Sequence, residues 1–457
     1  MEKVYKSPSS PWSPSHLPNA LKINGFQSTE PAAVTIPGSK SFSNRALILA
    51  ACSPGSTTLY GLLKSDDTYW CIDALSKIGV KFEFDGDKTT VHTPERLSPT
   101  SEENLFIGAA GTVARFLPGV LASVTNANFY LKADESLSKR PNDTLYGALR
   151  TLGANITKTS PEHSFPVRIS SQGLAQGLKG GHVHLDADVS SQYLSGLLIC
   201  APRCGEPVTI ELNGPIVQSR YVAMTIETMK QFGAHVEVSN DFNLFQVTPS
   251  QYTPTNLTVE ADLSAACYFF AAGALTEHAI TVTGINKNTL QPDIHVLDIL
   301  TQMGCNVEWH KADHLYDVTV KGPTKLKGGQ TFDMTSCSDQ ALTIGCIAAF
   351  ADGPVTITGI GHIRNHECDR VEALREGLTS LGVKCETTHS TVTVHPGEET
   401  KLKPASIRTY HDHRVAMAFS LIGAKLPGIE IENPSCVSKT FPDFFDTLES
   451  AGYITSK

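Results

Sequence analysis

The sequence predicts an α/β protein built from six repeats of one helix-and-strand unit, divided three plus three between two domains. The first observation is a recurring phrase in which an amphipathic helical stretch ends at an apolar residue and a glycine, and alternating strand-like residues follow. The glycines of the six copies are Gly79, Gly153, Gly233, Gly304, Gly382 and Gly452. They lie 74, 80, 71, 78 and 70 residues apart, so the repeats account for nearly all 457 residues.

The second observation is a further helix in each unit that is apolar on almost every side and must therefore be buried. These helices are predicted at 43–52, 111–122, 190–201, 262–275, 338–350 and 412–424. Strand-like segments such as PVTIEL at 207–212 and PVTITGI at 354–360 follow several of them. Each unit is therefore predicted to run helix, strand, helix, strand, strand.

Composition excludes several classes of protein. The chain has 37 basic and 46 acidic side chains, and its net charge of -9 opposes binding to nucleic acid or anionic membranes. No apolar run approaches the roughly 18 residues of a membrane-spanning helix. Eleven cysteines without a Cys-x-x-Cys pair, and no secretory hydrophobic region, indicate free thiols in a reducing compartment. We therefore expect a cytoplasmic protein.

The starts of the buried helices point to anion binding. Each helix opens with Ser, Gly or Asp, and helix N-termini present unpaired N–H groups and the positive end of the helix dipole. The segment PGSKSFSNRALI at 37–48 adds Lys40 and Arg45 at the first of these starts. Further candidates near element ends are Gly111, Arg140, Ser190, Ser191, Gln192, Ser219, Arg220, Arg364, Arg370, Arg414 and Lys439. The alternative is that they are ordinary helix caps and surface charges.

Eight segments, taken in chain order, resemble the signature segments of the 5-enolpyruvylshikimate-3-phosphate synthase family, also called 3-phosphoshikimate 1-carboxyvinyltransferases. They are PGSKSFSNRALILAA, GAAGTVARF, RPNDTL, SSQYLSGLL, SDQALT, HECDR, HDHRVAM and SKTFP. The resemblance implies a two-domain inside-out α/β barrel of βαβαββ units with buried helices. Domain I would comprise 1–37 and 260–457, including an N-terminal strand, and domain II 38–259. The crossovers near 37 and 260 would form a hinge.

The resemblance also implies a reaction: the enolpyruvyl group of phosphoenolpyruvate passes to the 5-hydroxyl of shikimate 3-phosphate, and phosphate leaves through a tetrahedral intermediate. Asp339 would be the base and Glu367 the proton carrier, with Lys40 and His413 also catalytic. Shikimate 3-phosphate would be held by Lys40, Ser41, Arg45, Ser190, Ser191, Gln192, Ser219, Asp339 and His366. Phosphoenolpyruvate would be held by Lys40, Gly111, Arg140, Gln192, Arg370, Arg414 and Lys439.

We expect no metal or other cofactor, no nucleic-acid or membrane partner, and a monomer. Phosphate leaves from carbon in this reaction, and positioned cations can stabilise the charge that develops. Two histidine patterns resemble parts of metal sites. His182 and His184 share one face of a predicted strand, and His411 and His413 flank Asp412, but neither pattern indicates a third ligand.

The chain departs from the family pattern at a few positions, and alternatives stay open. His366 stands where many members have lysine, and Ala109 and Phe116 also differ from the common residues. Gly111 implies room for glyphosate, which mimics the charges of phosphoenolpyruvate in this family. One alternative is UDP-N-acetylglucosamine enolpyruvyl transferase, although its mobile-loop cysteine has no counterpart at 135–143. The others are a paralogue acting on another cyclic alcohol and a non-catalytic scaffold that binds phosphometabolites.

Overall fold

The computed structural model describes residues 9–14, 16–28, 30–98, 104–171, 177–186 and 190–456. Its contacts divide the chain into two units. Unit 1 contains Gly38–Val259 and residues 9–12, and unit 2 contains Ser13–Pro37 and Glu260–Lys457. The chain passes from one unit to the other at 37–38 and again at 259–260.

Residues 9–12 pack with unit 1, whereas the expected division grouped residues 1–37 with 260–457. The reason is local packing. Both the backbone N–H and the hydroxyl of Ser10 donate to Asp66 Oδ1. The Trp12 ring packs edge-on against Tyr69 and Phe84, with centroids 5.5 and 6.0 Å away. Nothing in the Ser/Pro-rich composition of this segment indicated that contact.

Six four-stranded sheets form the framework, three in each unit. In unit 1 the strand orders are β14 (Asn256–Thr258), β3 (Gly55–Tyr60), β5 (Lys88–Thr93), β4 (Lys81–Asp85); β6 (Asn104–Phe106), β7 (Asn128–Lys132), β9 (Val167–Ser170), β8 (Asn155–Lys158); and β10 (Gly181–Leu185), β11 (Val208–Leu212), β13 (Leu244–Val247), β12 (Glu237–Val238). In unit 2 they are β2 (Ala32–Thr35), β15 (Ile280–Ile285), β17 (Leu315–Lys321), β16 (Asn306–Ala312); β18 (Gln330–Asp333), β19 (Val355–Thr358), β21 (Val392–His395), β20 (Lys384–Thr387); and β22 (Ser406–Ile407), β23 (Ile429–Glu432), β1 (Ala20–Phe26), β24 (Tyr453–Ser456).

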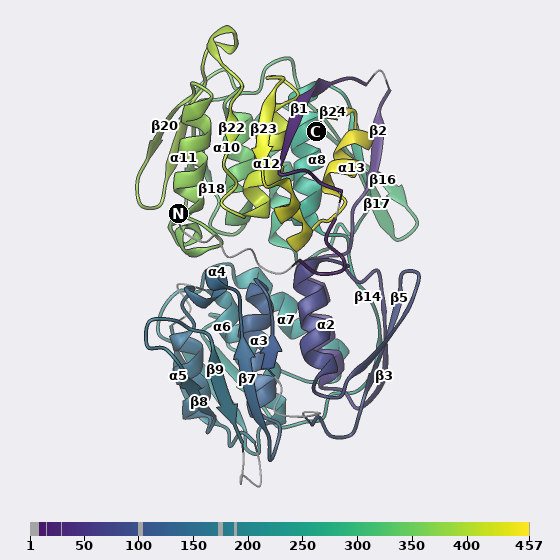
Figure 1. Ribbon diagram of the computed structural model, residues 1–457, viewed down its shortest axis with the longest axis vertical. Coiled ribbons are helices and arrows are strands. Elements are labelled where there is room, and N and C mark those ends of the chain that lie inside the picture. The colour runs from purple at the N-terminus through teal and green to yellow at the C-terminus, as the bar shows by residue number, and fades with distance from the viewer. Residues whose placement is uncertain are drawn as a thin grey trace. The chain divides into compact units, whose positions relative to one another are not determined.

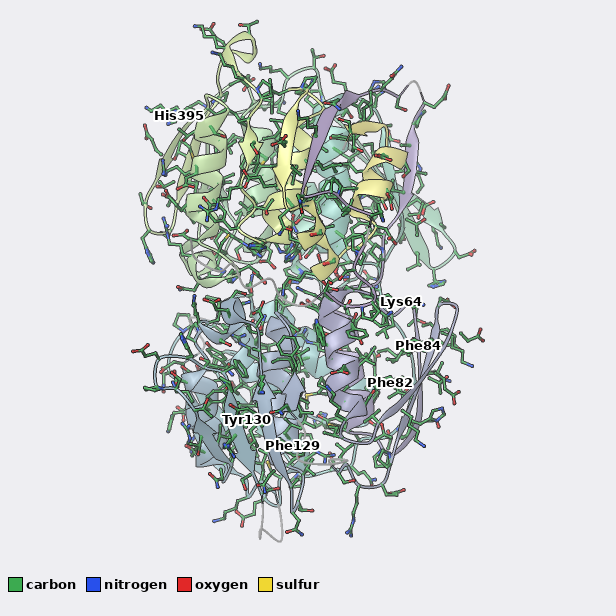
Figure 2. All side chains as sticks on the ribbon, viewed as in Figure 1. Lys64, Phe82, Phe84, Phe129, Tyr130 and His395 are labelled. Atoms are coloured by element: carbon green, nitrogen blue, oxygen red, sulfur yellow. The ribbon has the colours of Figure 1, made fainter. Side chains whose placement is uncertain are left out.

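All six sheets share one pairing pattern. The first two strands are parallel, and the remaining pairs are antiparallel. Side chains alternate across each strand, so Phe129 of β7 is buried and the adjacent Tyr130 is partly exposed (Figure 2). One face of each sheet is therefore available to cover helices.

The predicted buried helices are confirmed. They are α1 (Lys40–Ala51), α3 (Gly111–Ala122) and α6 (Ser191–Cys200) in unit 1, and α8 (Leu263–Thr276), α10 (Ala341–Ala348) and α12 (His413–Ile422) in unit 2. Every residue of α3 and of α10 is buried. In unit 2 the three helices contact one another and lie side by side inside the sheets (Figure 1). The predicted fold class is thus the observed one.

A second set of helices covers the sheets: α2 (Asp66–Ser76), α5 (Asp143–Thr151), α7 (Ser219–Gln231), α9 (Val296–Gln302), α11 (Arg370–Ser380) and α13 (Phe444–Ser450). Shortly after each comes one of the six repeat glycines, with φ between 83° and 106°. Glycine adopts this left-handed backbone conformation without strain, whereas a residue with a side chain is strained there. Among the described residues, no helix is both long enough and apolar enough to cross a membrane.

Two sheets of unit 2 are completed by strands that precede the crossing at 37–38. Strand β2 pairs with β15, which lies beyond both crossings in the sequence. Strand β1 pairs with β23 and β24, which also lie beyond both crossings. The Asp262 N–H donates to the Pro37 carbonyl at 2.9 Å, which joins the two passing segments. The sheets of unit 2 are therefore built from two separate stretches of the sequence.

Candidate functional sites in the two units

The unit 1 cluster comprises the predicted site residues of that unit: Lys40, Ser41, Arg45, Gly111, Arg140, Ser190, Ser191, Gln192 and Ser219. Lys40 is the first residue of α1, and its side chain is 16% exposed. Its Nζ lies 3.4 Å from Oδ2 of Asp67, a buried carboxylate at the start of α2. Sequence reasoning did not single out Asp67. This ion pair fixes a cation at the N-terminus of a buried helix.

Arg45 is held on several sides inside unit 1. Its side chain donates to the Thr225 hydroxyl at 2.7 Å and to the carbonyls of Ser41 and Tyr221 at 2.9 and 3.0 Å. The guanidinium also lies 5.0 Å from the centroid of the Phe116 ring. Burial lowers the pKa of Arg45 to about 10, so the group remains charged at neutral pH. These contacts tie α1 to α7 and leave little of the side chain exposed.

The N-terminus of α3 lies beside two arginines. A Cβ added at Gly111 would meet Nη1 of Arg140 at 3.1 Å, so the guanidinium packs directly on this glycine. Arg115, which sequence reasoning did not assign, donates to the carbonyls of Gly111 and Pro141 at 3.2 and 3.1 Å. Burial, assisted by Arg140, lowers the pKa of Arg115 to about 10. Two guanidinium groups therefore surround one helix start.

Side-chain contacts bring the starts of α1, α3 and α6 together. The Asn44 amide of α1 donates to the Thr112 hydroxyl of α3 at 2.6 Å. On α6, the Tyr193 hydroxyl donates to Pro141 O at 2.8 Å, the carbonyl that also accepts from Arg115. The N-termini of these three buried helices therefore lie close together within unit 1.

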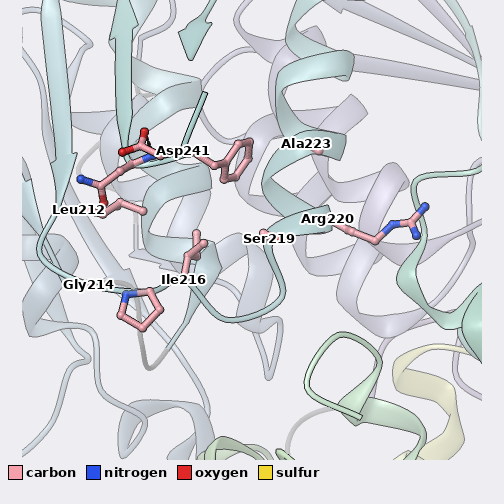
Figure 3. A pocket seen from close by; sticks show the side chains of 10 residues that line it. Leu212, Gly214, Ile216, Ser219, Arg220, Ala223 and Asp241 are labelled. Carbon is pink, nitrogen blue, oxygen red and sulfur yellow. Dashed lines mark hydrogen bonds between the residues drawn. The ribbon is translucent and has the colours of Figure 1, made fainter. Parts of the chain in front are cut away.

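The remaining serines lie at the starts of α6 and α7. The Ser190 hydroxyl accepts the Gln192 N–H at 3.3 Å and caps α6, and Ser191 is buried. Ser219 begins α7 and lines a pocket of about 480 Å³. Figure 3 shows Asp241 on the far side of this pocket from Arg220, whose guanidinium points away. Ser219 thus has open space beside it, unlike Ser191.

The unit 2 cluster comprises Asp339, His366, Glu367, Arg370, His413, Arg414 and Lys439, and Asp339 lies between two arginines. Its Oδ1 accepts from Arg370 Nη1 at 2.8 Å, and its Oδ2 accepts from Arg414 Nη2 at 3.0 Å. Burial raises the pKa of Asp339, but Arg414, a hydrogen bond with His366 and the charge of Arg370 outweigh it. The pKa therefore lies well below the ordinary value, and the carboxyl is ionised at neutral pH.

Arg370 is bound by carboxylates on three sides. Besides Asp339, it donates from Nη2 to Glu367 at 2.8 Å and from Nε to Asp412 at 2.7 Å. Its side chain is 2% exposed and that of Asp412 is fully buried. Burial alone lowers the pKa of Arg370, but these three carboxylates raise it above its ordinary value. The guanidinium is a fixed positive charge, and Asp412 is a structural partner that the sequence analysis did not assign.

The other members of the unit 2 cluster surround this pair. Lys439 Nζ lies 3.8 Å from Oε1 of Glu367. His366 Nδ1 lies 3.0 Å from Arg370 Nη1 and 3.6 Å from Asp339 Oδ1, and burial lowers the pKa of His366. His366 therefore supplies a neutral imidazole where many family members carry a lysine charge. His413, the first residue of α12, is buried, with Nδ1 3.6 Å from Asp412 Oδ1.

Asp293 is a buried carboxyl that the sequence analysis missed. The Ser264 hydroxyl donates to its Oδ2 at 3.0 Å, and Arg414 donates to the same hydroxyl at 3.4 Å. Burial raises the pKa of Asp293 to about 6, against the opposing effect of Arg414. Its place in the sequence, beside a proline in a short turn, gave no signal of burial.

Asp293→Asn should stabilise the folded chain in a pH-dependent way. Because the pKa of Asp293 is raised by folding, its contribution to stability is fully present below about pH 4 and is lost as pH rises through about 6. The asparagine variant should therefore be more stable than wild type by about 3 kcal/mol at pH 8 and by about half as much at pH 5. Urea unfolding at both pH values measures the difference, and an equal difference at the two values would contradict it.

Neither cluster, within the described residues, brings three His, Cys or carboxylate ligand atoms to metal-binding spacing. The clusters combine fixed cations, ionised carboxylates and helix N-termini instead. Such sites bind polyanions and can move protons to and from a bound hydroxyl.

Comparison with known proteins adds sequence relatives to this geometry. A family model described as EPSP synthase (3-phosphoshikimate 1-carboxyvinyltransferase) matches residues 28–448. A protein named 3-phosphoshikimate 1-carboxyvinyltransferase 2 from Halalkalibacterium halodurans is 44% identical over 453 residues, which is 99% of each chain. The 3-phosphoshikimate 1-carboxyvinyltransferase of Aeromonas salmonicida is 40% identical, over 94% of this chain and 99% of its own. An EPSP synthase structure from Acinetobacter baumannii aligns with a TM-score of 0.79 and 27% identity, over 96% of this chain and 100% of that one.

Proposed function

Because this chain belongs to the EPSP synthase (3-phosphoshikimate 1-carboxyvinyltransferase) family, we propose that its two clusters hold the substrates and carry out the family reaction. The chain is an enzyme of the shikimate pathway. It transfers the enolpyruvyl group of phosphoenolpyruvate to the 5-hydroxyl of shikimate 3-phosphate and releases phosphate. The alternative activity on UDP-N-acetylglucosamine has no support in the relatives described above.

Charge supports the assignment of residues to the substrates. Two phosphates and two carboxylates carry about six negative charges at neutral pH, which fixed cations and helix dipoles can offset. We assign Lys40, Ser41, Arg45, Ser190, Ser191, Gln192, Ser219, Asp339 and His366 to shikimate 3-phosphate. We assign Lys40, Gly111, Arg140, Gln192, Arg370, Arg414 and Lys439 to phosphoenolpyruvate. The neutral His366 acts here as a hydrogen-bonding group.

The observation that carries the proposed mechanism is the position of Asp339 between Arg370 and Arg414. When phosphoenolpyruvate binds beside these arginines, its negative charge partly offsets theirs, and the pKa of Asp339 rises. The carboxylate then becomes a stronger base for the 5-hydroxyl at the moment both substrates are present. Binding of one substrate therefore prepares the base for the other.

The bond changes follow from these roles. The 5-hydroxyl oxygen bonds to C2 of phosphoenolpyruvate as its proton passes to Asp339, while C3 gains a proton from the protonated form of Glu367. In the second step C3 returns its proton to Glu367 and the bond from C2 to the phosphate oxygen breaks. Phosphate leaves with the electron pair and takes up the proton held by Asp339. Lys439, 3.8 Å from Glu367, and Lys40 stabilise the anionic charge. His413, which we also assign to catalysis, is buried against Asp412 at the start of α12.

A phosphate-release assay tests the proposed function. Purified enzyme with phosphoenolpyruvate should release phosphate when shikimate 3-phosphate is added and should release none with UDP-N-acetylglucosamine. The product should carry the enolpyruvyl group on the 5-oxygen, which mass spectrometry and proton NMR can establish. Turnover with UDP-N-acetylglucosamine, or no turnover with either acceptor, would contradict the assignment.

Gly111→Ala should weaken binding at the phosphoenolpyruvate position. The new methyl group would stand 3.1 Å from Arg140 Nη1 and force the guanidinium to shift by a few tenths of an ångström. We expect a rise of roughly tenfold in the KM for phosphoenolpyruvate and a larger loss of inhibition by glyphosate, with kcat less affected.

Gly147→Ala is the matched control, because a Cβ at this exposed position of α5 meets nothing within 4 Å. It should leave both constants unchanged. If Gly111→Ala did the same, the assignment of Gly111 to this pocket would be wrong.

The molecular setting of the enzyme is also part of the proposal. We propose a monomer in the cytoplasm, with the crossings at 37–38 and 259–260 as the hinge between two domains. All eleven cysteines are free thiols in the structure, which suits a reducing compartment. Size-exclusion chromatography with light scattering should give a mass near 49.2 kDa. A mass of twice that value would overturn the monomer.

A further inference from the structure

Two histidines and a glutamate on an outer sheet surface of unit 1 lie at the spacing of metal ligands. His182 and His184 alternate with the buried Val183 along β10, so both imidazoles project from one exposed face. Strand β11 runs parallel to β10, and its Glu211 stands directly opposite His184. The ligand atoms of the three residues all lie within 4.8 Å of one another. No other group of this kind occurs in the part of the chain that the structure describes.

The distances match a tetrahedral ion. Glu211 Oε2 lies 3.3 Å from His182 Nε2 and 3.7 Å from His184 Nδ1. When zinc is bound at about 2.0–2.1 Å in tetrahedral geometry, neighbouring ligand atoms are about 3.4 Å apart. Octahedral magnesium would bring them to about 3.0 Å. One carboxylate oxygen already stands at the tetrahedral spacing from both imidazoles.

The sheet holds this arrangement in place. Strands β10 and β11 pair in register over their whole length, from Gly181 with Val208 to Leu185 with Leu212. The opposite faces of both strands are buried in the core, which fixes the side from which the ligands project. The three side chains remain 52%, 60% and 42% exposed, so water can complete the coordination. Only side-chain rotations are needed for an ion to bind.

We propose that His182, His184 and Glu211 form a binding site for a divalent transition-metal ion of the zinc type, separate from the residues assigned to the reaction. Two imidazoles and one carboxylate are ligands that suit zinc and copper and disfavour magnesium or calcium. The sequence showed the two histidines but not the third ligand, because Glu211 is brought to them only by the pairing of two strands. Bound metal joins β10 to β11 and should raise the thermal unfolding midpoint of the enzyme.

Zinc titration of the full chain tests the site. Tag-free enzyme, stripped with chelator and kept reduced, is titrated with zinc chloride at pH 7.5 in a calorimeter. We expect wild type to bind one zinc ion more than His184→Ala, or to bind that ion at least about tenfold more tightly. The zinc affinity of Glu211→Gln should fall by a similar factor. Magnesium chloride at millimolar concentration should not compete.

His310→Ala is the matched control. His310 and Glu308 form an exposed pair on β16, 3.4 Å apart, with one imidazole in place of two. This variant should bind zinc as wild type does. Cobalt substitution supplies a second readout, since the tetrahedral absorption bands of cobalt should be present in wild type and His310→Ala and lost in His184→Ala.

Three results would overturn the proposal. The first is no saturable zinc binding below about 1 mM. A dissociation constant of about 1 mM corresponds to a binding free energy of only about 4 kcal/mol. The second is unchanged binding in His184→Ala, which would place the ion at other residues. The third is unchanged binding in Glu211→Gln, which would leave a two-histidine chelate without the carboxylate. Equal unfolding of the metal-free variants and wild type excludes misfolding as the cause of lost binding.

Discussion

Asp339→Asn is expected to lower kcat by roughly 10²- to 10⁴-fold, the range typical of a lost general base. An amide cannot accept the proton of the substrate hydroxyl, whereas the carboxylate of Asp339 is kept ionised chiefly by Arg414, His366 and Arg370 against the effect of burial. Asparagine retains an oxygen that can accept one hydrogen bond from these arginines, so the fold should survive. Steady-state phosphate release with both substrates measures the loss.

Asp298→Asn provides the control for that experiment. Asp298 lies on α9 of the same unit and is 76% exposed beside His295, so the same change of charge should leave kcat near the wild-type value. A kcat for Asp339→Asn within about tenfold of wild type would show that another group removes the proton. Circular dichroism spectra of both variants at the assay temperature should overlie, which separates a catalytic effect from a loss of folded enzyme.

Asp412→Ala should lower the free energy of unfolding by about 3–5 kcal/mol, the usual cost of removing one partner from a buried ion pair. The Asp412 carboxylate is fully buried, accepts from Arg370 Nε at 2.7 Å and caps α12 by accepting the Arg414 N–H at 2.8 Å. Its removal leaves a buried guanidinium with one carboxylate fewer. Urea unfolding followed by circular dichroism measures the change.

Asp262→Ala is a control that separates the two roles of Asp412, as a helix cap and as an ion-pair partner of Arg370. Asp262 caps α8 by accepting the Ala265 N–H at 3.0 Å, so its loss should cost about 1 kcal/mol, as for a typical cap. Asp412→Asn, which keeps an oxygen for the cap and loses the charge, should fall between the two alanine variants. If Asp412→Ala cost no more than Asp262→Ala, the pair with Arg370 would contribute nothing to stability.

The six-unit fold could be predicted because each repeat carries its own local signals. A helix that is apolar on every side must be buried. The glycine after each helix of the second set marks the end of that helix, as Gly79 does for α2. The long-range contacts could not be predicted in this way. The acceptors for the Arg45 side chain include Tyr221 and Thr225, which lie about 180 residues further along the chain.

The residues of the candidate site could likewise be predicted only in part. Motifs gave the charged residues of both clusters, including Arg370 and Arg414, but not the way in which each charge is balanced. Asp67, Asp293 and Asp412 were missed because an aspartate in a cap or turn pattern looks the same whether it is exposed or buried. Their burial is decided by tertiary packing, which no local pattern records.

The placement of the N-terminal strands in unit 2 also sets an order for synthesis on the ribosome. Unit 1 lacks a sheet edge until β14, at Asn256–Thr258, has been made. The partners of β1 are synthesised much later, because β23 and β24 lie near the other end of the chain. Lys22 of β1, for example, pairs with Ser456. Such remote pairing is slow to form and leaves strand edges unpaired meanwhile. Unit 1 should therefore fold first as the chain emerges, and β1 should need protection from aggregation until translation ends.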